Sequence, residues 1–312
     1  MNELLPGLYD HIEPVASRIA GKAASLQPVD PQRAYLVDVA CRIVRYGQYR
    51  VAAPSGDTAG AAGPAGGADG IEATLAWFAL LEENLEGFVS GRVTAPDIIR
   101  LGGGRLWEAF QARDAVCAVY GHGVARALGP RLAGKDVLEL GAGTGGTTRR
   151  LAGALGTSRR FVLSDIRQNF LDRLAAELPG LPLETALVDI NDPDDSVGTF
   201  DAVYSTNCLH VAKDLPATLA WIRGRLRPGG ALVLGEGSHY SDDVPSPVSL
   251  VLSLFDGWWD APPSKWRAQP GFLMPAEWFA AFESAGFESA ALESWGDGRR
   301  TFGGVYWAFA AA

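Results

Sequence analysis

Residues 136–146 read Asp-Val-Leu-Glu-Leu-Gly-Ala-Gly-Thr-Gly-Gly, and this stretch decides the fold of the 312-residue chain. A short apolar run leads into a cluster of glycines, and helix-forming residues follow at 147–155. Glycine lets the backbone turn sharply and approach a ligand closely, because it carries no Cβ. The helix that follows points unpaired N–H groups toward the same place. The pattern therefore predicts the opening of a nucleotide-binding βαβ unit.

The overall composition narrows the classes of function. The chain has 27 Lys and Arg against 36 Asp and Glu, a formal charge of −9, which argues against broad nucleic-acid binding. Its apolar fraction of 47% is enough for a substantial core. We expect no signal peptide and no membrane span, because Gly, Pro or charged residues interrupt the apolar tracts.

The three cysteines, Cys41, Cys117 and Cys208, show no paired spacing. This argues against a disulfide framework and against a zinc site, and we expect no metal centre. Reduced thiols fit a cytosolic protein best. The sequence therefore predicts a cytoplasmic localisation.

Two parts of the chain differ in pattern. Residues 1–128 have apolar residues at helical spacing, and we interpret them as a helical subdomain. Within it, residues 52–70 are almost entirely Ala, Gly, Pro, Ser and Thr, which predicts a flexible loop. Residues 129–312 alternate strands with helices, which predicts a mainly parallel sheet covered on both faces.

Individual elements are predicted within both parts. Strands are expected at 136–140, 161–165, 183–188, 200–205 and 231–235, with two further candidates at 289–293 and 304–310. Helices are expected at 10–24, 31–49, 71–85, 94–101, 106–128, 147–155, 171–178 and 215–226. The last of these helices is stopped by Pro228-Gly229-Gly230, since proline and glycine disfavour a continuing helix.

The glycine turn fits two kinds of cofactor equally well. Gly141, Gly143 and Gly146 match the dinucleotide pattern G-x-G-x-x-G. Gly141, Gly143 and Gly145 match the G-x-G-x-G turn of S-adenosylmethionine (SAM) methyltransferases. Asp165 at the tip of the second strand could accept hydrogen bonds from the ribose of either cofactor, or cap the next helix.

Two further acids favour SAM. Asp189 follows the third strand at the mouth of the sheet, where it could contact the adenine amino group. The alternative for Asp189 is an ordinary turn residue before Asn191. Glu139 lies inside the first strand, just before the glycines, which is an unusual place for an acid.

A wider set of motifs resembles the methyltransferase domains of modular polyketide synthases. The set comprises 137–148, Leu163-Ser164-Asp165-Ile166, Asp189-Ile190, Leu209-His210, Pro228-Gly229-Gly230, Glu236 and Gly257-Trp258-Trp259. The glycine motif is generic to class I methyltransferases, whereas the combination is more specific and covers most of the chain from about Leu80. The resemblance implies a Rossmann-like class I methyltransferase fold, with a mainly parallel seven-stranded sheet and an N-terminal helical lid.

The resemblance also implies which residues form the site. The cofactor-binding residues would be Glu139, Gly141, Gly143, Gly145, Asp165, Ile166, Asp189, Ile190 and Asn207. Glu139 would help hold the methionine part of SAM. His210 would be the general base and Glu236 would orient its ring, since the matching His and Glu are the family's catalytic pair. The alternatives are a helix-terminus histidine and a solvated glutamate at a strand end.

The acceptor of the methyl group is less clear from the sequence. Residues 211–215 and 271–273 are more similar to O-methylating domains, whereas Gly257-Trp258-Trp259 is closer to C-methylating ones. We expect transfer to a hydroxyl of a small-molecule or carrier-protein-bound acyl substrate, with the α-carbon of a β-ketoacyl thioester as the alternative. An NAD-dependent oxidoreductase and a SAM-binding protein without catalysis are the hypotheses of other classes.

Several arginines could take part in recognition. Docking of an acidic carrier protein would need a local basic patch, and Arg223, Arg225 and Arg227 are close in sequence. Arg267 could meet a phosphate or a carbonyl, or it could lie on the surface.

Overall fold

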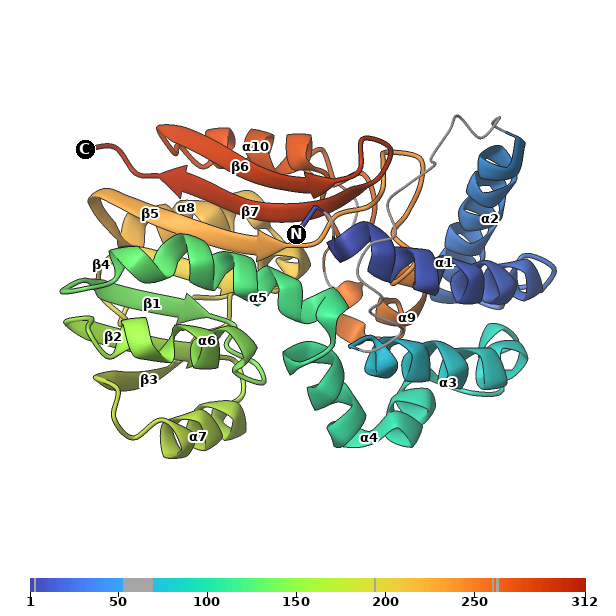
Figure 1. Cartoon of the computed structure of the whole chain (residues 1–312), viewed down its shortest axis with the longest axis horizontal. Helices are drawn as coiled ribbons and strands as arrows, with labels where there is room; N and C mark the ends of the chain where they lie inside the picture. The colour runs from blue at the N-terminus through green and yellow to red at the C-terminus, as the bar shows by residue number, and fades with distance from the viewer. Residues whose placement is uncertain (3, 53–69, 194, 260, 262–263) are drawn as a thin grey trace. The chain divides into compact units, whose positions relative to one another are not determined.

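The computed structural model describes the whole chain except residues 3, 53–69, 194, 260 and 262–263 (Figure 1). The flexible loop predicted at 52–70 therefore lies outside the described residues, apart from its two ends. No helix in the described part is both long and apolar enough to cross a membrane.

The described helices and strands follow the order α1 (Leu4–Ala23), α2 (Pro31–Ala52), α3 (Glu72–Val89), α4 (Ala95–Ala112), α5 (Ala115–Leu128), β1 (Asp136–Leu140), α6 (Gly146–Leu155), β2 (Arg160–Asp165), α7 (Gln168–Glu177), β3 (Leu183–Leu187), β4 (Phe200–Thr206), α8 (Leu215–Arg225), β5 (Leu226–Glu236), α9 (Ser249–Leu252), α10 (Pro275–Ser284), β6 (Ser289–Gly296) and β7 (Thr301–Phe309). Short 3-10 turns lie at Gly129–Arg131, Leu209–Val211 and Asp256–Trp258.

The chain forms two compact units, each assembled from several segments. The first unit contains residues 1–116, 239–259 and 295–302. The second contains residues 117–238, 260–294 and 303–312. The glycine turn at 141–146 and the strand ends that follow it all belong to the second unit, which we call the sheet unit.

In the first unit, α1 packs against α2 and α3, and α3 packs against α4. The sequence predicted separate helices at 94–101 and 106–128, but the structure places the break elsewhere. Gly103, with φ 66°, only kinks α4, and the chain breaks at Asp114 instead. The buried Asp114 carboxylate accepts hydrogen bonds from Thr74 N and Thr74 Oγ1 at 2.7 and 2.8 Å and from Val116 N at 3.1 Å. This carboxylate satisfies an N–H group at the start of α5, which stabilises the helix there.

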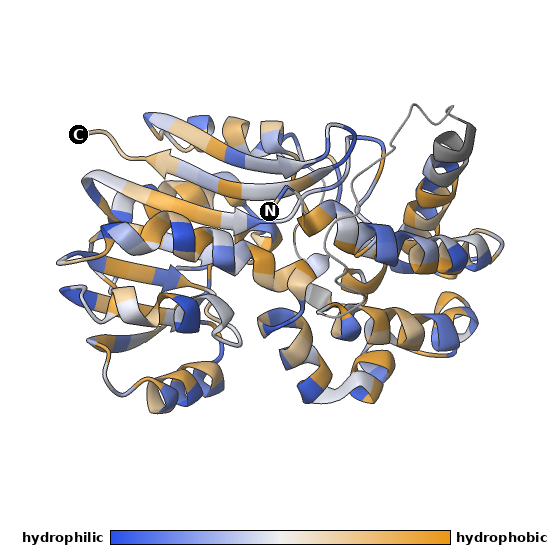
Figure 2. Cartoon of the chain, in the orientation of Figure 1, coloured by the Kyte–Doolittle hydropathy of each residue, from blue (hydrophilic) through white to orange (hydrophobic). Residues whose placement is uncertain are grey.

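The sheet unit contains seven strands in the order β3-β2-β1-β4-β5-β7-β6. Strands β1 to β5 pair in parallel, and β7 pairs antiparallel to β5. Helices α5 and α6 cover one face, and α8 and α10 cover the other (Figure 1). Figure 2 shows hydrophobic residues along β1 and β5, on either side of the central β4. This confirms the predicted class I methyltransferase sheet.

Two predicted boundaries in the sheet unit differ from the structure. Strand β5 begins at Leu226, five residues earlier than predicted, and Pro228-Gly229-Gly230 lies within it. The strand accommodates these residues because its register against β4 shifts between Phe200 and Ala202. Helix α10 was not predicted; it starts with proline after Met274, and Glu277 Oε2 accepts a hydrogen bond from Met274 N at 2.8 Å.

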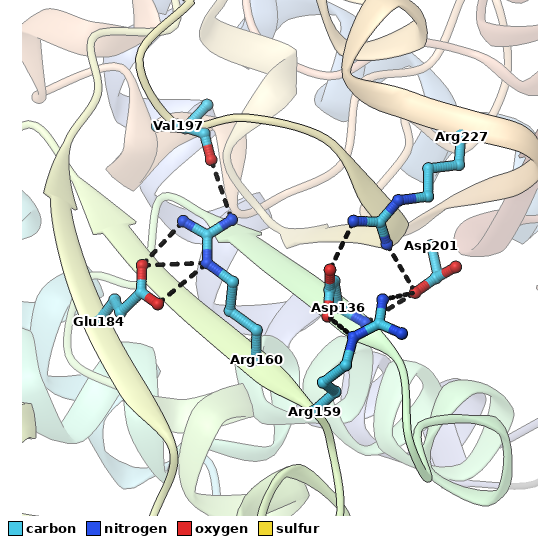
Figure 3. Close-up of polar contacts among 7 residues, drawn as sticks. All are labelled: Asp136, Arg159, Arg160, Glu184, Val197, Asp201 and Arg227. Atoms are coloured by element: carbon cyan, nitrogen blue, oxygen red, sulfur yellow. Dashed lines mark hydrogen bonds and ion pairs between the residues drawn. The ribbon is translucent and has the colours of Figure 1, made fainter.

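An ion-pair cluster fixes the amino end of the sheet (Figure 3). Asp136, the first residue of β1, binds Arg159 Nε at 2.6 Å and Arg227 Nη2 at 2.5 Å. Asp201 accepts from Arg227 Nη1 at 2.9 Å and from the backbone N–H of Asp136 at 2.8 Å. The cluster ties β1, β4 and β5 together at the edge opposite the glycine turn.

Candidate active site

The glycine turn between β1 and α6 has a backbone that other residues adopt poorly. Gly141, Gly143 and Gly145 have φ of 68°, 52° and 79°. A Cβ on Gly141 would lie 2.3 Å from Cys208 Sγ, and one on Gly145 would lie 2.1 Å from Leu174 Cδ2. A Cβ on Gly143 would meet nothing closer than 3.9 Å. Two glycines are thus required by packing, and the third leaves open space beside the turn.

Asp165, at the carboxyl end of β2, holds this turn in place. Its Oδ2 accepts a hydrogen bond from Gly143 N at 2.8 Å, and its Oδ1 accepts one from Arg167 N at 2.9 Å. A carboxylate oxygen has more than one acceptor site, so each oxygen can accept a further bond. Ile166 follows with 63% of its surface exposed, a large apolar side chain beside the turn.

Glu139 is buried beneath the turn. Its Oε2 accepts hydrogen bonds from Thr148 Oγ1 at 2.7 Å and from Tyr204 OH at 2.8 Å. Burial raises the pKa of Glu139 to about 7, although both hydrogen bonds favour the carboxylate. These bonds join β1 to α6 and β4, so Glu139 supports the turn from below.

Asn207 lies at the carboxyl end of β4. It has a left-handed backbone, φ 48°, which asparagine tolerates better than most residues. Its Oδ1 is buried and has no hydrogen-bond partner among the described residues. A buried acceptor without a donor is costly, so this oxygen suits a ligand that brings an N–H or O–H group.

Asp189 and Ile190 follow β3. Asp189 Oδ1 accepts a hydrogen bond from Asn191 N at 2.9 Å, which is the geometry of a turn residue. Ile190 belongs to the apolar core, and its carbonyl accepts a hydrogen bond from Thr218 Oγ1 at 2.9 Å. These contacts fix the loop after β3.

His210 and Glu236 form a buried pair at the carboxyl edge of the sheet. His210 Nδ1 lies 2.8 Å from Glu236 Oε2. Glu236 Oε1 accepts hydrogen bonds from the backbone N–H groups of Cys208 and Leu209, both at 3.0 Å. Glu236 is fully buried, so it is not a solvated strand end, and His210 is only 7% exposed. Three hydrogen bonds thus hold a carboxylate against one nitrogen of an imidazole.

Two buried residues precede α10. Phe272 was not predicted to belong to the site, whereas Arg267 was predicted either to meet a phosphate or a carbonyl or to lie on the surface. The ring centroids of Phe272 and His210 are 5.3 Å apart. Phe272 also lies close to Gly237, because a Cβ on Gly237 would be 2.8 Å from Phe272 Cε1. Arg267 is only 2% exposed, so it is not a surface arginine. Both lie on the irregular segment before α10, where no periodic pattern distinguishes a buried side chain from an exposed one.

The three clustered arginines all have protein partners. Arg223 Nε donates to Ala285 O at 2.9 Å, and Arg225 Nη2 lies 3.2 Å from Asp195 Oδ1. Arg227 belongs to the ion-pair cluster at the amino end of the sheet. All three side chains therefore bind other parts of the protein and stabilise the fold. Among the described residues, no group of three or more His, Cys, Asp and Glu side chains could hold a metal ion.

Comparison with known proteins gives the family context. Residues 138–232 match a methyltransferase domain family. The chain is 32% identical over 279 residues to the polyketide synthase ThaG of Burkholderia thailandensis, covering 82% of this chain and 5% of that protein. It is 37% identical over 135 residues to the polyketide methyltransferase ustM of Ustilaginoidea virens, covering 40% of this chain and 29% of that protein. The chain thus spans less than a third of either relative.

Solved structures share the fold across almost the whole chain. The DszA carbon methyltransferase aligns with a TM-score of 0.73 at 20% identity, covering 97% of this chain and 90% of that one. The trans-methyltransferase CalH in complex with SAH aligns with a TM-score of 0.70, also at 20% identity and with the same coverage. The matched domain, the sheet with its glycine turn and these relatives identify the chain as a SAM-dependent methyltransferase of the class I fold.

Proposed function

We propose that the chain transfers the methyl group of SAM to an acyl intermediate of polyketide type, with His210 as the general base. The observation that carries this proposal is the buried contact between His210 Nδ1 and Glu236 Oε2 at 2.8 Å, at the carboxyl edge of the sheet. Ligands of open α/β sheets bind outside this edge. Polyketide synthases among the relatives support the substrate class.

The residues around the glycine turn fit SAM. SAM supplies a methyl group already activated on a sulfonium, so the protein mainly has to align donor and acceptor. The open side of Gly143 leaves room for the methionine part, and the unpaired Asn207 Oδ1 would accept a hydrogen bond from its ammonium group. Asp165 would hold the ribose, with Ile166 beside the adenine.

Three other predicted residues have supporting or peripheral roles in this proposal. Glu139 would act indirectly, because its carboxylate supports the turn through Thr148 and Tyr204. Asp189 keeps lone pairs that could accept from the adenine amino group, although one oxygen holds Asn191 N. Ile190 would contribute through the shape of the loop after β3.

The His210–Glu236 pair would accept the proton that the substrate loses. With Nδ1–H donated to Glu236, the imidazole presents Nε2 as the atom that accepts a proton. Glu236 then stabilises the imidazolium that forms, and its bonds to Cys208 N and Leu209 N keep it from turning away. This is the orienting logic of a catalytic triad, applied to a hydroxyl or a C–H acid.

The proposed acceptor is either a hydroxyl or the α-carbon of a β-ketoacyl thioester. The similarity of residues 211–215 and 271–273 to O-methylating domains favours a hydroxyl. The DszA neighbour is a carbon methyltransferase, which makes the α-carbon at least as well supported. We further propose a carrier-bound thioester as substrate, and residues 1–128 as the helical lid of a core formed by 129–312.

Incubation with SAM and two model thioesters tests the function and its acceptor together. The probes are acetoacetyl and 3-hydroxybutyryl thioesters of N-acetylcysteamine. Mass spectrometry reports a gain of one methylene, and NMR of the product distinguishes a C-methyl from an O-methyl group. Methylation of either probe supports the proposal, and absence of methylation on both, and on their carrier-bound forms, would refute it.

A further inference from the structure

Arg267 is a buried arginine whose guanidinium is not fully hydrogen-bonded by the described residues. Both terminal nitrogens, Nη1 and Nη2, are buried without a hydrogen-bond partner among the described residues. A guanidinium normally satisfies its donors, because leaving a buried charged group unpaired costs considerable free energy. The burial of these two unpaired nitrogens of Arg267 therefore needs an explanation other than bonding to the described residues.

The backbone around Arg267 is fixed rather than loose. Ser264 and Arg267 exchange backbone hydrogen bonds of 2.7 and 3.1 Å in a tight turn. Ala268 N then donates to Glu277 Oε1 at 2.6 Å, which anchors the segment to the first turn of α10. Five residues after Arg267, Phe272 packs against the His210 ring. Arg267 thus lies on the same anchored segment as a residue that contacts the His210 ring.

The charge of Arg267 interacts with two carboxylates, one of which is Glu236 of the pair. Burial lowers the pKa of Arg267 to about 10, while the carboxylates of Glu236 and Glu277 favour its charged form. The side chain therefore stays protonated near neutral pH. Glu236 already gives its oxygens to His210, Cys208 and Leu209, so it balances the charge of Arg267 without occupying its donors.

We propose that Arg267 binds the acceptor oxygen that gains negative charge when His210 takes the proton. This inference rests on the proposed methyl transfer. The C–H or O–H bond of the acceptor breaks, the proton goes to His210 Nε2, and the electron pair remains on the acceptor. In a β-ketoacyl thioester the charge spreads to a carbonyl oxygen as an enolate; in a hydroxyl it stays on oxygen. The acceptor then takes the methyl group, and S-adenosylhomocysteine (SAH) leaves.

The two donors of Arg267 would stabilise this oxyanion. Removing one preorganised donor from an oxyanion site typically costs about 10²–10³-fold in kcat. We therefore expect Arg267→Met to lower kcat by about that factor, with a smaller change in KM. Arg267→Lys keeps the charge but loses the planar pair of donors, so it should recover part of the rate.

Proton exchange tests the same role without methyl transfer. In D2O with SAH bound, the wild-type protein should exchange the α-proton of the acetoacetyl thioester above the uncatalysed rate. Arg267→Met should lose most of that excess, while its SAH affinity stays within about twofold of wild type. The matched control is Arg223→Met, whose arginine bonds to Ala285 O instead, and which should leave kcat unchanged.

Each outcome decides the inference. If Arg267→Met keeps a kcat and an exchange rate near those of wild type, the inference is overturned. It is also overturned if Arg267→Met loses SAH affinity and melting temperature together and Arg267→Lys does not recover them, since that result marks a structural role. If the protein methylates the hydroxybutyryl thioester instead, the α-proton exchange test does not apply. The loss of kcat in Arg267→Met and its partial recovery in Arg267→Lys then test the role of Arg267. A wild-type protein that methylates neither probe refutes the proposed function first, and this inference with it.

Discussion

At the scale of single residues, the glycine turn depends on Asp165, whose Oδ2 accepts a hydrogen bond from Gly143 N at 2.8 Å. The glycine-rich sequence predicted a sharp turn after the first strand, and Gly141, Gly143 and Gly145 form that turn with φ values of 68°, 52° and 79°. The sequence did not show that Asp165 holds Gly143 N or that Glu139 faces Thr148 and Tyr204, because those partners lie on other elements. Contacts of this kind depend on tertiary packing.

Asp165→Ala should weaken SAH binding. The substitution removes the proposed acceptor for the ribose and also the bond to Gly143 N at 2.8 Å that holds the turn. A hydrogen bond to a charged group contributes about 1.5–3 kcal/mol, so the dissociation constant should rise by roughly 10- to 150-fold. Isothermal titration calorimetry measures this, and an unchanged affinity would remove Asp165 from the cofactor site.

Gly145→Ala should destabilise the sheet unit. Its φ of 79° disfavours any Cβ, and that Cβ would lie 2.1 Å from Leu174 Cδ2. We expect a loss of about 1–3 kcal/mol in the free energy of unfolding. Gly153→Ala, in the helix that Gly145 precedes, is the matched control, because nothing lies within 4 Å of its Cβ position. It should be neutral or stabilising by up to about 1 kcal/mol. Equal denaturation midpoints for the two variants would contradict this account.

At the scale of elements, local patterns located most of the strands and helices but not all of their ends. Strand β1 has the predicted bounds, whereas β5 extends back to Leu226 through Pro228-Gly229-Gly230. The ladder to β4 accommodates this run by a register shift, which only pairing between distant strands can show. Helix α10 was missed because its short apolar face contacts α8 and has no long periodic run.

The ion-pair cluster at the amino end of the sheet should make stability depend on acid pH. The hydrogen bond from Arg159 is the main reason that the pKa of Asp136 falls to about 2, and Arg227 adds to it. A lowered folded-state pKa stabilises the fold above the unfolded value, near 3.9, and this contribution disappears as the pH falls toward 2.

Asp136→Asn should remove that dependence. Because Arg159 is largely exposed and solvent screens the pair, we expect a loss of only about 1–2 kcal/mol at pH 7. Urea denaturation of both proteins between pH 7 and pH 2 measures the difference, which should shrink as the pH falls. A difference that stays constant over this range would show that the carboxylate charge does not matter.

At the scale of the whole molecule, the chain is built from discontinuous segments that a linear pattern does not reveal. The first unit joins α3 to residues 239–259 through contacts such as Trp77 with Phe255, whose ring centroids are 5.5 Å apart. It joins α1 to residues 295–302 through Arg300, whose Nη1 lies 2.9 Å from Asp10 and 2.6 Å from Glu13. The lid role of residues 1–128 stays a prediction about function.

In the proposed function, His210, oriented by Glu236, is the base of a SAM-dependent methyl transfer. The most direct measurement compares wild type with His210→Ala in methylation of whichever model thioester the protein accepts, together with SAH titration. His122→Ala is the control, since His122 lies on α5 and its Nδ1 is 3.1 Å from Ala118 O. We predict that His210→Ala lowers kcat by about 10²–10⁴-fold, while SAH affinity stays near wild type and His122→Ala remains active. A His210→Ala protein that keeps substantial activity would contradict the account.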